Sequence, residues 1–280
     1  MIEVRNLSKS FGKKSVLKNV SFVLEKGVYG LLGANGAGKT TLIRCLTLLY
    51  PDKNNAILNN GVSITKDREY LANIGYLPQQ FGLFKELSVE NALKLLASLK
   101  ELNKSQSSDD IEKCLELVNL SDEKDKRVSA LSGGMLRRVG IAQALLGSPE
   151  LIIFDEPTAG LDPIERLRFK SIISKMDKDK IIIVSTHIVE DIDAVCDRVI
   201  VMDNGNMLGV YTCEELKSKA DGKVYEMTEN EIIPAKNSFV EKVFEQEGKT
   251  IKRVLSSERI NGNQCNPTLE DGYLCVIEKI

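Results

Sequence analysis

The feature that most constrains this chain is a glycine-rich stretch that starts at Gly33. It contains glycine, four further residues and then Gly-Lys-Thr, which is the spacing of a phosphate-binding P-loop. An apolar run of strand type, residues 28–32, precedes it, and a helical pattern, residues 41–46, follows it. Glycines let backbone N–H groups approach an anion, and a helix start adds unpaired N–H groups and a positive dipole end. The sequence therefore predicts a nucleoside-triphosphate site made by Gly33, Ala34, Asn35, Gly36, Ala37, Gly38, Lys39, Thr40 and Thr41.

Two side chains of this stretch have defined chemistry in such a site. Lys39 would reach the β- and γ-phosphates, and Thr40 would offer its hydroxyl to Mg²⁺. The alternative interpretation is a glycine-rich turn ahead of a helix, without a ligand. Because both the pattern and its strand–helix context match, we favour the nucleotide site.

The rest of the chain reads as an α/β protein with additions. Continuous apolar runs at residues 151–154 and 181–184, with helical patterns between them, indicate parallel strands covered on both faces. Residues 1–30 alternate like β-structure, and residues 80–146 form a mainly helical insertion, with Ser88 as a helix cap and a polar break over residues 103–110. We expect two domains, residues 1–218 and 219–280.

The expected C-terminal domain is a small α+β unit. Its pattern predicts a helix at residues 238–246, a strand at 250–255 and a final helix capped by Thr268. Leu269, Tyr273 and Val276 would lie on the buried side of that helix.

Composition narrows the function classes. The 38 Lys and Arg nearly balance the 40 Asp and Glu, so no overall field points to nucleic acid, and we expect no nucleic-acid partner. The N-terminal lysines Lys9, Lys13, Lys14 and Lys18 read as a solvated face. Six cysteines without a CxxC pair favour reduced, packed thiols. No signal-peptide layout is seen at the N-terminus, and no apolar run approaches the roughly 18 residues of a membrane span, so any membrane role would need another subunit.

Two acids follow the first buried strand. Asp155 and Glu156 stand at its carboxyl end, the edge of an open parallel sheet where ligands bind. Asp155 suits a Mg²⁺ shell, and Glu156 could orient or deprotonate an attacking water. Taken alone, such a pair is a turn or a helix cap, but beside a P-loop we interpret it as catalytic.

A second anion-binding surface is suggested by Ser132, Gly133 and Gly134, which open a helix. An ordinary Ser N-cap explains the same residues equally well. Two such surfaces with a single P-loop suggest that two chains share a nucleotide.

At this point the chain resembles the nucleotide-binding subunit of an ABC transporter, over about residues 1–218. Leu131 to Met135 stands where that family has its LSGGQ signature, with Met135 in place of glutamine. The resemblance implies an ABC-type P-loop fold with a mostly parallel core sheet, an N-terminal antiparallel β-subdomain, a helical insertion and a C-terminal α+β extension. It implies binding of ATP and Mg²⁺ and ATP hydrolysis. It also implies a head-to-tail dimer of two copies, in which the P-loop of one copy faces Ser132–Gly134 of the other. Separate transmembrane permease subunits would place the chain peripherally on the cytoplasmic face of the membrane.

Four further positions take roles from the resemblance. Phe11 matches the aromatic residue that stacks on adenine, with a hairpin-core residue as the alternative. Gln79 matches the glutamine that touches Mg²⁺ and water, with Gln80 as a competitor. Asp162 matches the loop at the dimer interface and also reads as an N-cap before proline. His187, the one histidine in the sequence, matches the γ-phosphate contact, whereas a lone histidine is more often structural.

The subfamily is suggested by residues 81–91 and 267–274, which resemble exporter ATPases of bacterial drug and bacteriocin resistance. We therefore expect an ATP-hydrolysing subunit that powers export of a drug, peptide or other small molecule. The rival is an ABC ATPase not coupled to transport, such as an iron–sulfur assembly component.

Overall fold

The computed structural model describes residues 1–67, 69–102, 104–228 and 237–280. These residues form two compact units, 1–207 and 208–280. The division falls inside strand β10 (Asn206–Thr212), whereas the sequence interpretation puts the change of domain after residue 218. Each unit is described by itself.

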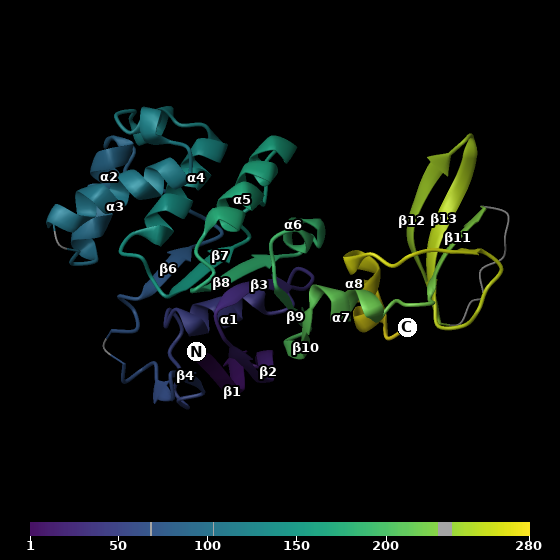
Figure 1. Ribbon diagram of the computed structural model, residues 1–280. Coiled ribbons are helices and arrows are strands. Elements are labelled where there is room, and N and C mark those ends of the chain that lie inside the picture. The colour runs from purple at the N-terminus through teal and green to yellow at the C-terminus, as the bar shows by residue number, and fades with distance from the viewer. Residues whose placement is uncertain (68, 103, 229–236) are drawn as a thin grey trace. The chain divides into compact units, whose positions relative to one another are not determined.

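The first unit is built on a six-stranded sheet (Figure 1), whose order is β10-β9-β3-β8-β7-β6. The pairs β6–β7, β7–β8, β8–β3 and β3–β9 are all parallel. This confirms an α/β fold with a mostly parallel core sheet. The strands are β3 (Gly27–Leu32), β6 (Ile74–Leu77), β7 (Leu151–Asp155), β8 (Ile181–Thr186) and β9 (Arg198–Asp203).

Helices cover both faces of this sheet, which explains why β7 and β8 are apolar up to their carboxyl ends. Figure 1 shows α5 (Pro163–Lys175) above the sheet and α1 (Lys39–Leu46) below it. Every residue of β7 and β8 is buried. Phe154 of β7 meets Phe169 of α5 edge to face, with ring centroids 5.8 Å apart. The short helix α6 (Glu190–Asp193) follows β8.

The N-terminal β-subdomain is antiparallel, as expected. Its four strands are ordered β2-β1-β4-β5, and each neighbouring pair is antiparallel. In β1 and β2 the buried residues are mainly aliphatic and recur between exposed polar residues, which is typical of a sheet with one face on the core. The strands are β1 (Ile2–Phe11), β2 (Lys14–Leu24), β4 (Ile57–Asn59) and β5 (Val62–Ser63).

The helical insertion consists of α2, α3 and α4, which group together in Figure 1. The Ser88 hydroxyl accepts a hydrogen bond from the Asn91 N–H, so Ser88 caps α2 as expected. The expected polar break over residues 103–110 is wrong from Lys104 onward, because α3 already begins there; residue 103 lies outside the described residues. The first turns of α3 carry no apolar periodicity that could have revealed them. The bounds are α2 (Val89–Leu99), α3 (Lys104–Leu117) and α4 (Gly133–Leu145), with 3₁₀ turns η1 (Ser121–Glu123) and η2 (Val128–Ala130) between α3 and α4.

The second unit is an antiparallel sheet with two helices. The sheet order is β12-β13-β11-β14. Thr268 caps α8 through a reciprocal capping box with Asp271, Leu269 is buried, and Tyr273 and Val276 are half-buried. A Cβ on Gly272 would lie 1.9 Å from the Leu216 carbonyl oxygen, so the close packing of α8 on α7 requires glycine there. The elements are α7 (Cys213–Ser218), β11 (Val224–Thr228), β12 (Ser238–Gln246), β13 (Lys249–Ser256), β14 (Asn263–Gln264) and α8 (Leu269–Glu278).

The helix predicted at residues 238–246 is wrong, because these residues form the strand β12. Phe239 and Phe244 pair with Leu255 and Ile251 of β13, and the register shifts between Val240 and Lys242. This bulge adds one residue to β12, so that two phenylalanines five positions apart oppose partners only four apart. Around the bulge, apolar residues recur at spacings of three and four, which imitate a helical period: Phe239, Val240, Val243 and Phe244.

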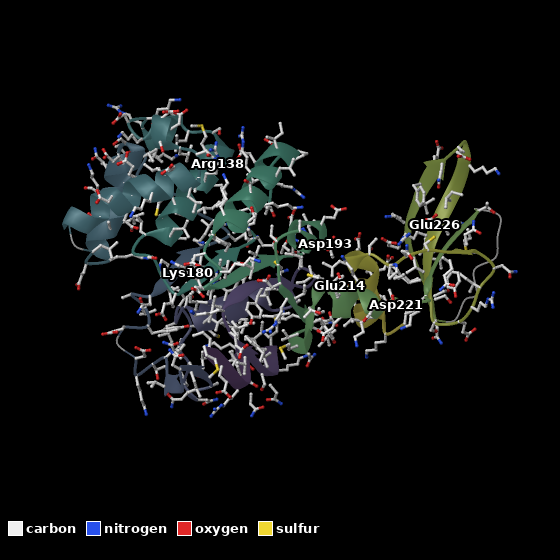
Figure 2. All side chains as sticks on the ribbon, in the orientation of Figure 1. Arg138, Lys180, Asp193, Glu214, Asp221 and Glu226 are labelled. Carbon is white, nitrogen blue, oxygen red and sulfur yellow. The ribbon has the colours of Figure 1, made fainter. Side chains whose placement is uncertain are left out.

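A buried arginine joins the sheet of the second unit to α8. The Arg253 guanidinium lies 2.6 Å from Asp271 Oδ2, 2.9 Å from Glu241 Oε2 and 3.1 Å from Glu226 Oε1. Glu226, labelled in Figure 2, stands on β11. Asp271 is fully buried and Arg253 is 6% exposed, so this cluster is part of the interior of the unit.

None of the helices in the described ranges combines the length and apolar character needed to cross a membrane.

Candidate nucleotide-binding site

The glycine-rich stretch forms the loop between β3 and α1, as the sequence predicts. Gly36 and Gly38 have φ angles of 87° and 107°, a region that favours glycine. A Cβ on Gly33 would lie 2.5 Å from the Met202 carbonyl oxygen. Each of these positions therefore requires glycine for a reason visible in the backbone.

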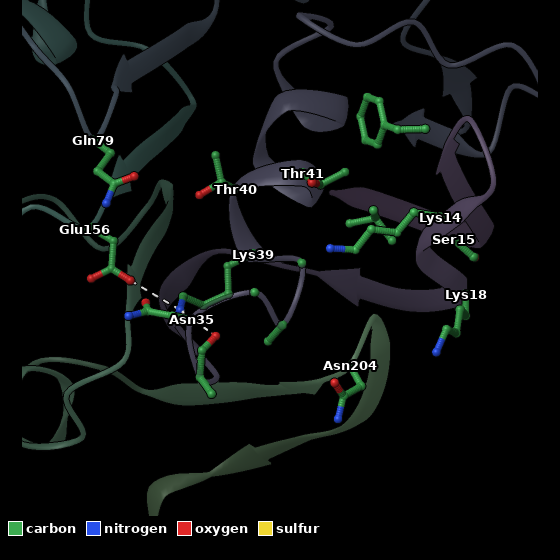
Figure 3. A pocket seen from close by; sticks show the side chains of 16 residues that line it. Lys14, Ser15, Lys18, Asn35, Lys39, Thr40, Thr41, Gln79, Glu156 and Asn204 are labelled. Atoms are coloured by element: carbon green, nitrogen blue, oxygen red, sulfur yellow. Dashed lines mark hydrogen bonds and ion pairs between the residues drawn. The ribbon is translucent and has the colours of Figure 1, made fainter.

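A cavity of about 790 Å³ opens over this loop. Figure 3 shows Gln79 and Glu156 together on one side of it and Lys14, Ser15 and Lys18 on the other, with Lys39 between the two groups. The lining is completed by the loop itself, by Phe11 and Val16, and by Asn204. The cavity thus collects residues from five separate places in the chain.

Lys39 is held with its ammonium group at the floor of this cavity. Its Nζ donates to the Gly33 carbonyl oxygen at 2.6 Å and lies 3.2 Å from Glu156 Oε1. Both side chains are 6% exposed, and Figure 3 marks the contact with a dashed line. A buried cation beside the P-loop backbone is positioned to meet a polyanion.

Asp155 has the features of a cation ligand. It is fully buried at the end of β7, where Oδ1 accepts from Ser185 Oγ at 2.6 Å and from Thr40 Oγ1 at 3.4 Å. Burial raises the pKa of Asp155, whereas the hydrogen bonds from Ser185 and Thr40 act in the opposite direction. Oδ2 has no hydrogen-bond partner among the described residues. An unsatisfied carboxylate oxygen beside a threonine hydroxyl fits the oxygen ligands that Mg²⁺ prefers.

Glu156 and His187 lie in contact. His187 Nδ1 is 3.0 Å from Glu156 Oε2, and the His187 side chain is 40% exposed. The φ angle of Glu156 is 49°, a left-handed conformation that is uncommon for residues other than glycine. Its N–H donates to Ser185 Oγ at 3.0 Å, which helps to hold that conformation. His187 is therefore a half-exposed neighbour of the acid rather than a core histidine.

Gln79 and Phe11 also reach the cavity. Gln79 lines it, whereas Gln80 lines the adjacent groove of about 500 Å³. Phe11 is 45% exposed, and its ring meets Tyr50 edge to face at 5.2 Å. A side chain this exposed is not a hairpin-core residue, and its free surface is available to a planar ligand.

The remaining predicted residues stand apart from this cavity in the same chain. Ser132 caps α4 by accepting from the Met135 N–H at 3.2 Å, and Gly133 lines the adjacent groove. Asp162 caps α5 by accepting from the Glu165 N–H at 2.9 Å, with proline at the next position. The two N-cap interpretations are confirmed. The roles of Ser132, Gly133, Gly134 and Asp162 toward a second copy stay predictions.

Several residues of the site were not predicted. Lys14 and Lys18 are exposed, as expected of a solvated face, but they also line the cavity. Their position in the sequence, just after Phe11, could have revealed this role, since the turn after Phe11 brings the start of β2 over the P-loop. Asn204 reaches the cavity from the turn after β9, where the Gly205 N–H donates to the Ala37 carbonyl oxygen at 3.0 Å. The Ser185 contacts depend on sheet pairing and left no local pattern.

The comparisons with known proteins agree with this geometry. Residues 17–159 match the family model described as ABC transporter. The chain is 33% identical over 225 residues to the linearmycin resistance ATP-binding protein LnrL of Bacillus subtilis, covering 79% of this chain and 72% of that protein. It is 38% identical over 220 residues to the methionine import ATP-binding protein MetN 4 of Oceanobacillus iheyensis, covering 74% of this chain and 64% of that protein.

Solved structures show the same fold. The structure of cbiO1 from Clostridium perfringens, part of the ABC transporter complex cbiONQ, superposes with a TM-score of 0.68 at 28% identity. The match covers 75% of this chain and 88% of that one. With the P-loop cavity, the fold and these relatives in agreement, this chain belongs to the ABC transporter family, as an ATP-binding subunit with an ATPase domain.

Proposed function

We propose that this chain binds ATP with Mg²⁺ in the P-loop cavity and hydrolyses it to power transport through separate membrane subunits. One observation carries the proposal: a single cavity brings together Lys39, Gln79 and Glu156, with Asp155 beneath it and His187 on Glu156. These are the groups that phosphoryl transfer to water requires.

Binding would be the work of the loop and of the hairpin. The backbone N–H groups of residues 34–41 and the start of α1 would surround the phosphates, and the Lys39 ammonium would neutralise part of their charge. Phe11 would stack on the adenine ring from the exposed side of the hairpin. Lys14 and Lys18 add positive charge to the rim of the cavity.

Thr40, Asp155 and Gln79 would hold Mg²⁺. Within the described residues there is no group of three or more His, Cys, Asp or Glu that could hold a metal ion. A few protein ligands are enough for an ion whose other ligands are phosphate oxygens and waters. When bound, Mg²⁺ would neutralise charge on the β- and γ-phosphates.

Glu156 would act on the attacking water. Its carboxylate faces the cavity, where it would accept a hydrogen bond from that water and receive its proton as the water oxygen attacks the γ-phosphorus. The bond between the γ-phosphorus and the bridging oxygen would break in the same step, and ADP would leave with that oxygen. His187 contacts the same carboxylate and would orient it while donating to the γ-phosphate. Gln79 would fix the water from the other side. The gain would come mainly from positioning and charge stabilisation.

The site would be completed by a second copy. Ser132–Gly134 stand at the start of α4 outside the cavity of their own chain, with Ser132 and Gly133 exposed. In a head-to-tail dimer these residues would contact the ATP held by the P-loop of the partner, and Asp162 would lie at the interface.

The membrane partner would dock at the groove beside the site. Gln79, Gln80 and Phe81 line this groove on one side, and Gly133 and Leu136 line it on the other. A permease bound there would sense Gln79 directly. We place the chain peripherally on the cytoplasmic face of the membrane.

Export of a drug, peptide or other small molecule is the direction we propose, and the similarity to a resistance protein supports it. The similarity to an importer makes direction the point to test. Cells lacking the gene should become sensitive to an antimicrobial compound, and the wild-type gene, but not Glu156→Gln, should restore resistance. If cells lacking the gene instead fail to grow on an external nutrient and show no loss of resistance, the direction of transport is import.

Hydrolysis itself is tested with purified protein. The wild type should release phosphate from ATP in the presence of Mg²⁺, and Glu156→Gln should lower turnover about 1,000-fold while ATP still binds. Wild-type turnover in Glu156→Gln would contradict the assignment of the catalytic carboxylate. No observation here favours an iron–sulfur assembly role.

A further inference from the structure

One side chain outside the cavity contacts the backbone of both catalytic loops. Arg137 lies on α4, and its guanidinium donates to five carbonyl oxygens. Nη1 donates to Pro78 and Gln79 at 3.1 and 3.0 Å. Nη2 donates to Asp155 and Glu156 at 3.1 and 2.6 Å, and Nε donates to Pro157 at 2.9 Å.

This arrangement uses all the donor capacity of the side chain. A guanidinium carries five N–H donors in a fixed planar fork, and here backbone oxygens take bonds from all three nitrogens. Burial lowers the pKa of Arg137, whereas the nearby Asp155 and Glu156 carboxylates act to raise it. The half-buried guanidinium directs its printed hydrogen bonds to backbone oxygens, so these contacts fix the positions of backbone groups.

The carbonyl groups belong to the residues whose side chains do the proposed chemistry. Gln79 follows β6, and Asp155 and Glu156 end or follow β7, the neighbouring parallel strand. The pairing of these strands ends at Leu77 and Phe154, just before the two loops. Arg137 therefore ties the loops together beyond the last pair of residues between β6 and β7.

Glu156 depends on this tie more than the others. Its left-handed backbone is a strained conformation for a glutamate and persists only where its surroundings fix it. Ser185 holds the N–H of Glu156, and Arg137 holds its carbonyl oxygen at 2.6 Å. Together they aim the carboxylate at Lys39 and His187.

The same side chain connects these loops to Ser132–Gly134. Arg137 stands on the second turn of the helix that Ser132 caps, so a shift of the start of α4 would move its guanidinium. We propose that Arg137 is a positioning residue: it holds the backbone of Glu156 and Gln79 in the arrangement needed for hydrolysis. Because Arg137 stands on α4, the position of α4 would determine that arrangement. This inference rests on the proposed roles of those two residues.

The next residue on the helix offers a matched control. Arg138, labelled in Figure 2, is buried on α4, where Arg137 is half-buried, and it also donates to backbone carbonyl groups, those of Val118 and Asn119 at 3.0 Å each. It faces Glu165 of α5 at 3.2 Å and touches neither catalytic loop. Arg138→Ala should therefore lower thermal stability and leave turnover within about threefold of the wild type.

Arg137→Ala should lower kcat about 100-fold with the Kd for ATP within about threefold, because misplacing a catalytic group by about 1 Å costs that much rate. The kcat of Arg137→Lys should lie between those of the wild type and Arg137→Ala, since an ammonium group cannot span both loops as the planar guanidinium does. If Arg137→Ala does not fold, Arg137→Gln and Arg137→Lys carry the test.

The measurements are phosphate release at saturating ATP, ATP binding at equilibrium and thermal melting of each purified full-length variant. The proposal is overturned if Arg137→Ala keeps kcat within threefold of the wild type, or if kcat and melting temperature fall in parallel for the Arg137 and Arg138 variants. Wild-type turnover in Glu156→Gln would instead overturn the proposed function, so the two failures are distinguishable.

Discussion

Each unit of this molecule buries a cluster of charges, and the first cluster faces a cavity whereas the second lies between a sheet and a helix of its own unit. In the first unit Lys39 pairs with Glu156 at the floor of a cavity, and Asp155 keeps one oxygen unpartnered within the described structure. In the second unit the Arg253 guanidinium is surrounded by three carboxylates and also donates to the Asn266 carbonyl oxygen at 3.1 Å. Buried charge alone therefore does not mark a binding site.

The two clusters differ in whether their charged groups face open space that a ligand could fill. Lys39 and the P-loop N–H groups open onto about 790 Å³ of space, where a polyanion can complete their interactions. Arg253 instead donates its hydrogen bonds to groups of its own unit, between the sheet and α8. We infer that the first cluster serves a ligand and the second serves the fold, and four changes test this division.

The largest effect is expected at Arg253. Arg253→Met leaves Asp271 and Glu241 buried without their counter-charge, and breaking a buried ion pair in this way costs about 3–5 kcal/mol. Urea unfolding followed by NMR at the methyl groups of Val254 and Leu255 would measure the loss in the full chain. Lys242→Ala, which removes an exposed lysine 3.7 Å from Glu241, is the control and should change little. An unchanged free energy of unfolding in Arg253→Met would contradict a structural role and would indicate a ligand role for Arg253.

Lys39→Ala should weaken ATP binding about 100-fold, because it removes the buried cation that meets the phosphates. Equilibrium titration with ATP and Mg²⁺ measures the change. Lys14→Ala and Lys18→Ala alter exposed lysines of the same cavity and should weaken binding only a few-fold. Unchanged affinity in Lys39→Ala would refute the phosphate-binding assignment.

His187→Ala should lower turnover about tenfold and leave ATP affinity nearly intact, since it removes one hydrogen bond to the Glu156 carboxylate. Steady-state phosphate release, together with an ATP titration, separates the two effects. His187→Gln keeps a donor and should retain more turnover than alanine. A purely structural histidine would instead show wild-type hydrolysis with a changed melting temperature.

The fourth expected effect is a pH dependence of the second unit. Burial and the neighbouring Asp271 raise the pKa of Glu241 from its ordinary 4.5 to about 7. The folded unit then binds this proton more tightly than the unfolded chain, so stability falls as pH rises from about 5 to 7 and levels off above that. Arg253, Asp271, Glu226 and Lys242 are the other charged groups of the cluster.

Urea midpoints at pH 5.5 and 8.0, read at the same methyl groups, measure this change. Glu241→Gln should flatten the difference, because its amide does not titrate. A wild-type midpoint that is higher at pH 8.0 would contradict the expected sign.

The sequence predicted most of the first unit because its signals are local. A P-loop spacing, continuous apolar strands and N-caps at Ser88, Ser132 and Asp162 each depend on a few neighbouring residues. In the second unit the bulge in β12 changed the apolar spacing, and a strand was mistaken for a helix. Local pattern fails where register depends on the partner strand.

The unpredicted parts of the site have the same cause. Arg137 reaches carbonyl groups 18 to 59 residues away in sequence, and a carbonyl group carries no residue identity. Lys14, Lys18 and Asn204 reach the cavity through turns whose direction depends on sheet order. These contacts require the tertiary fold.

The most direct test of the shared ATP site is the oligomeric state of Glu156→Gln in ATP and Mg²⁺, measured by analytical ultracentrifugation. With hydrolysis blocked, the chain should form an ATP-dependent dimer. Adding Gly133→Asp should prevent that dimer without disturbing the monomer, since a Cβ on Gly133 meets nothing within 4 Å but its carboxylate would oppose the phosphates of the partner. A Glu156→Gln protein that binds ATP and stays monomeric would contradict the shared site.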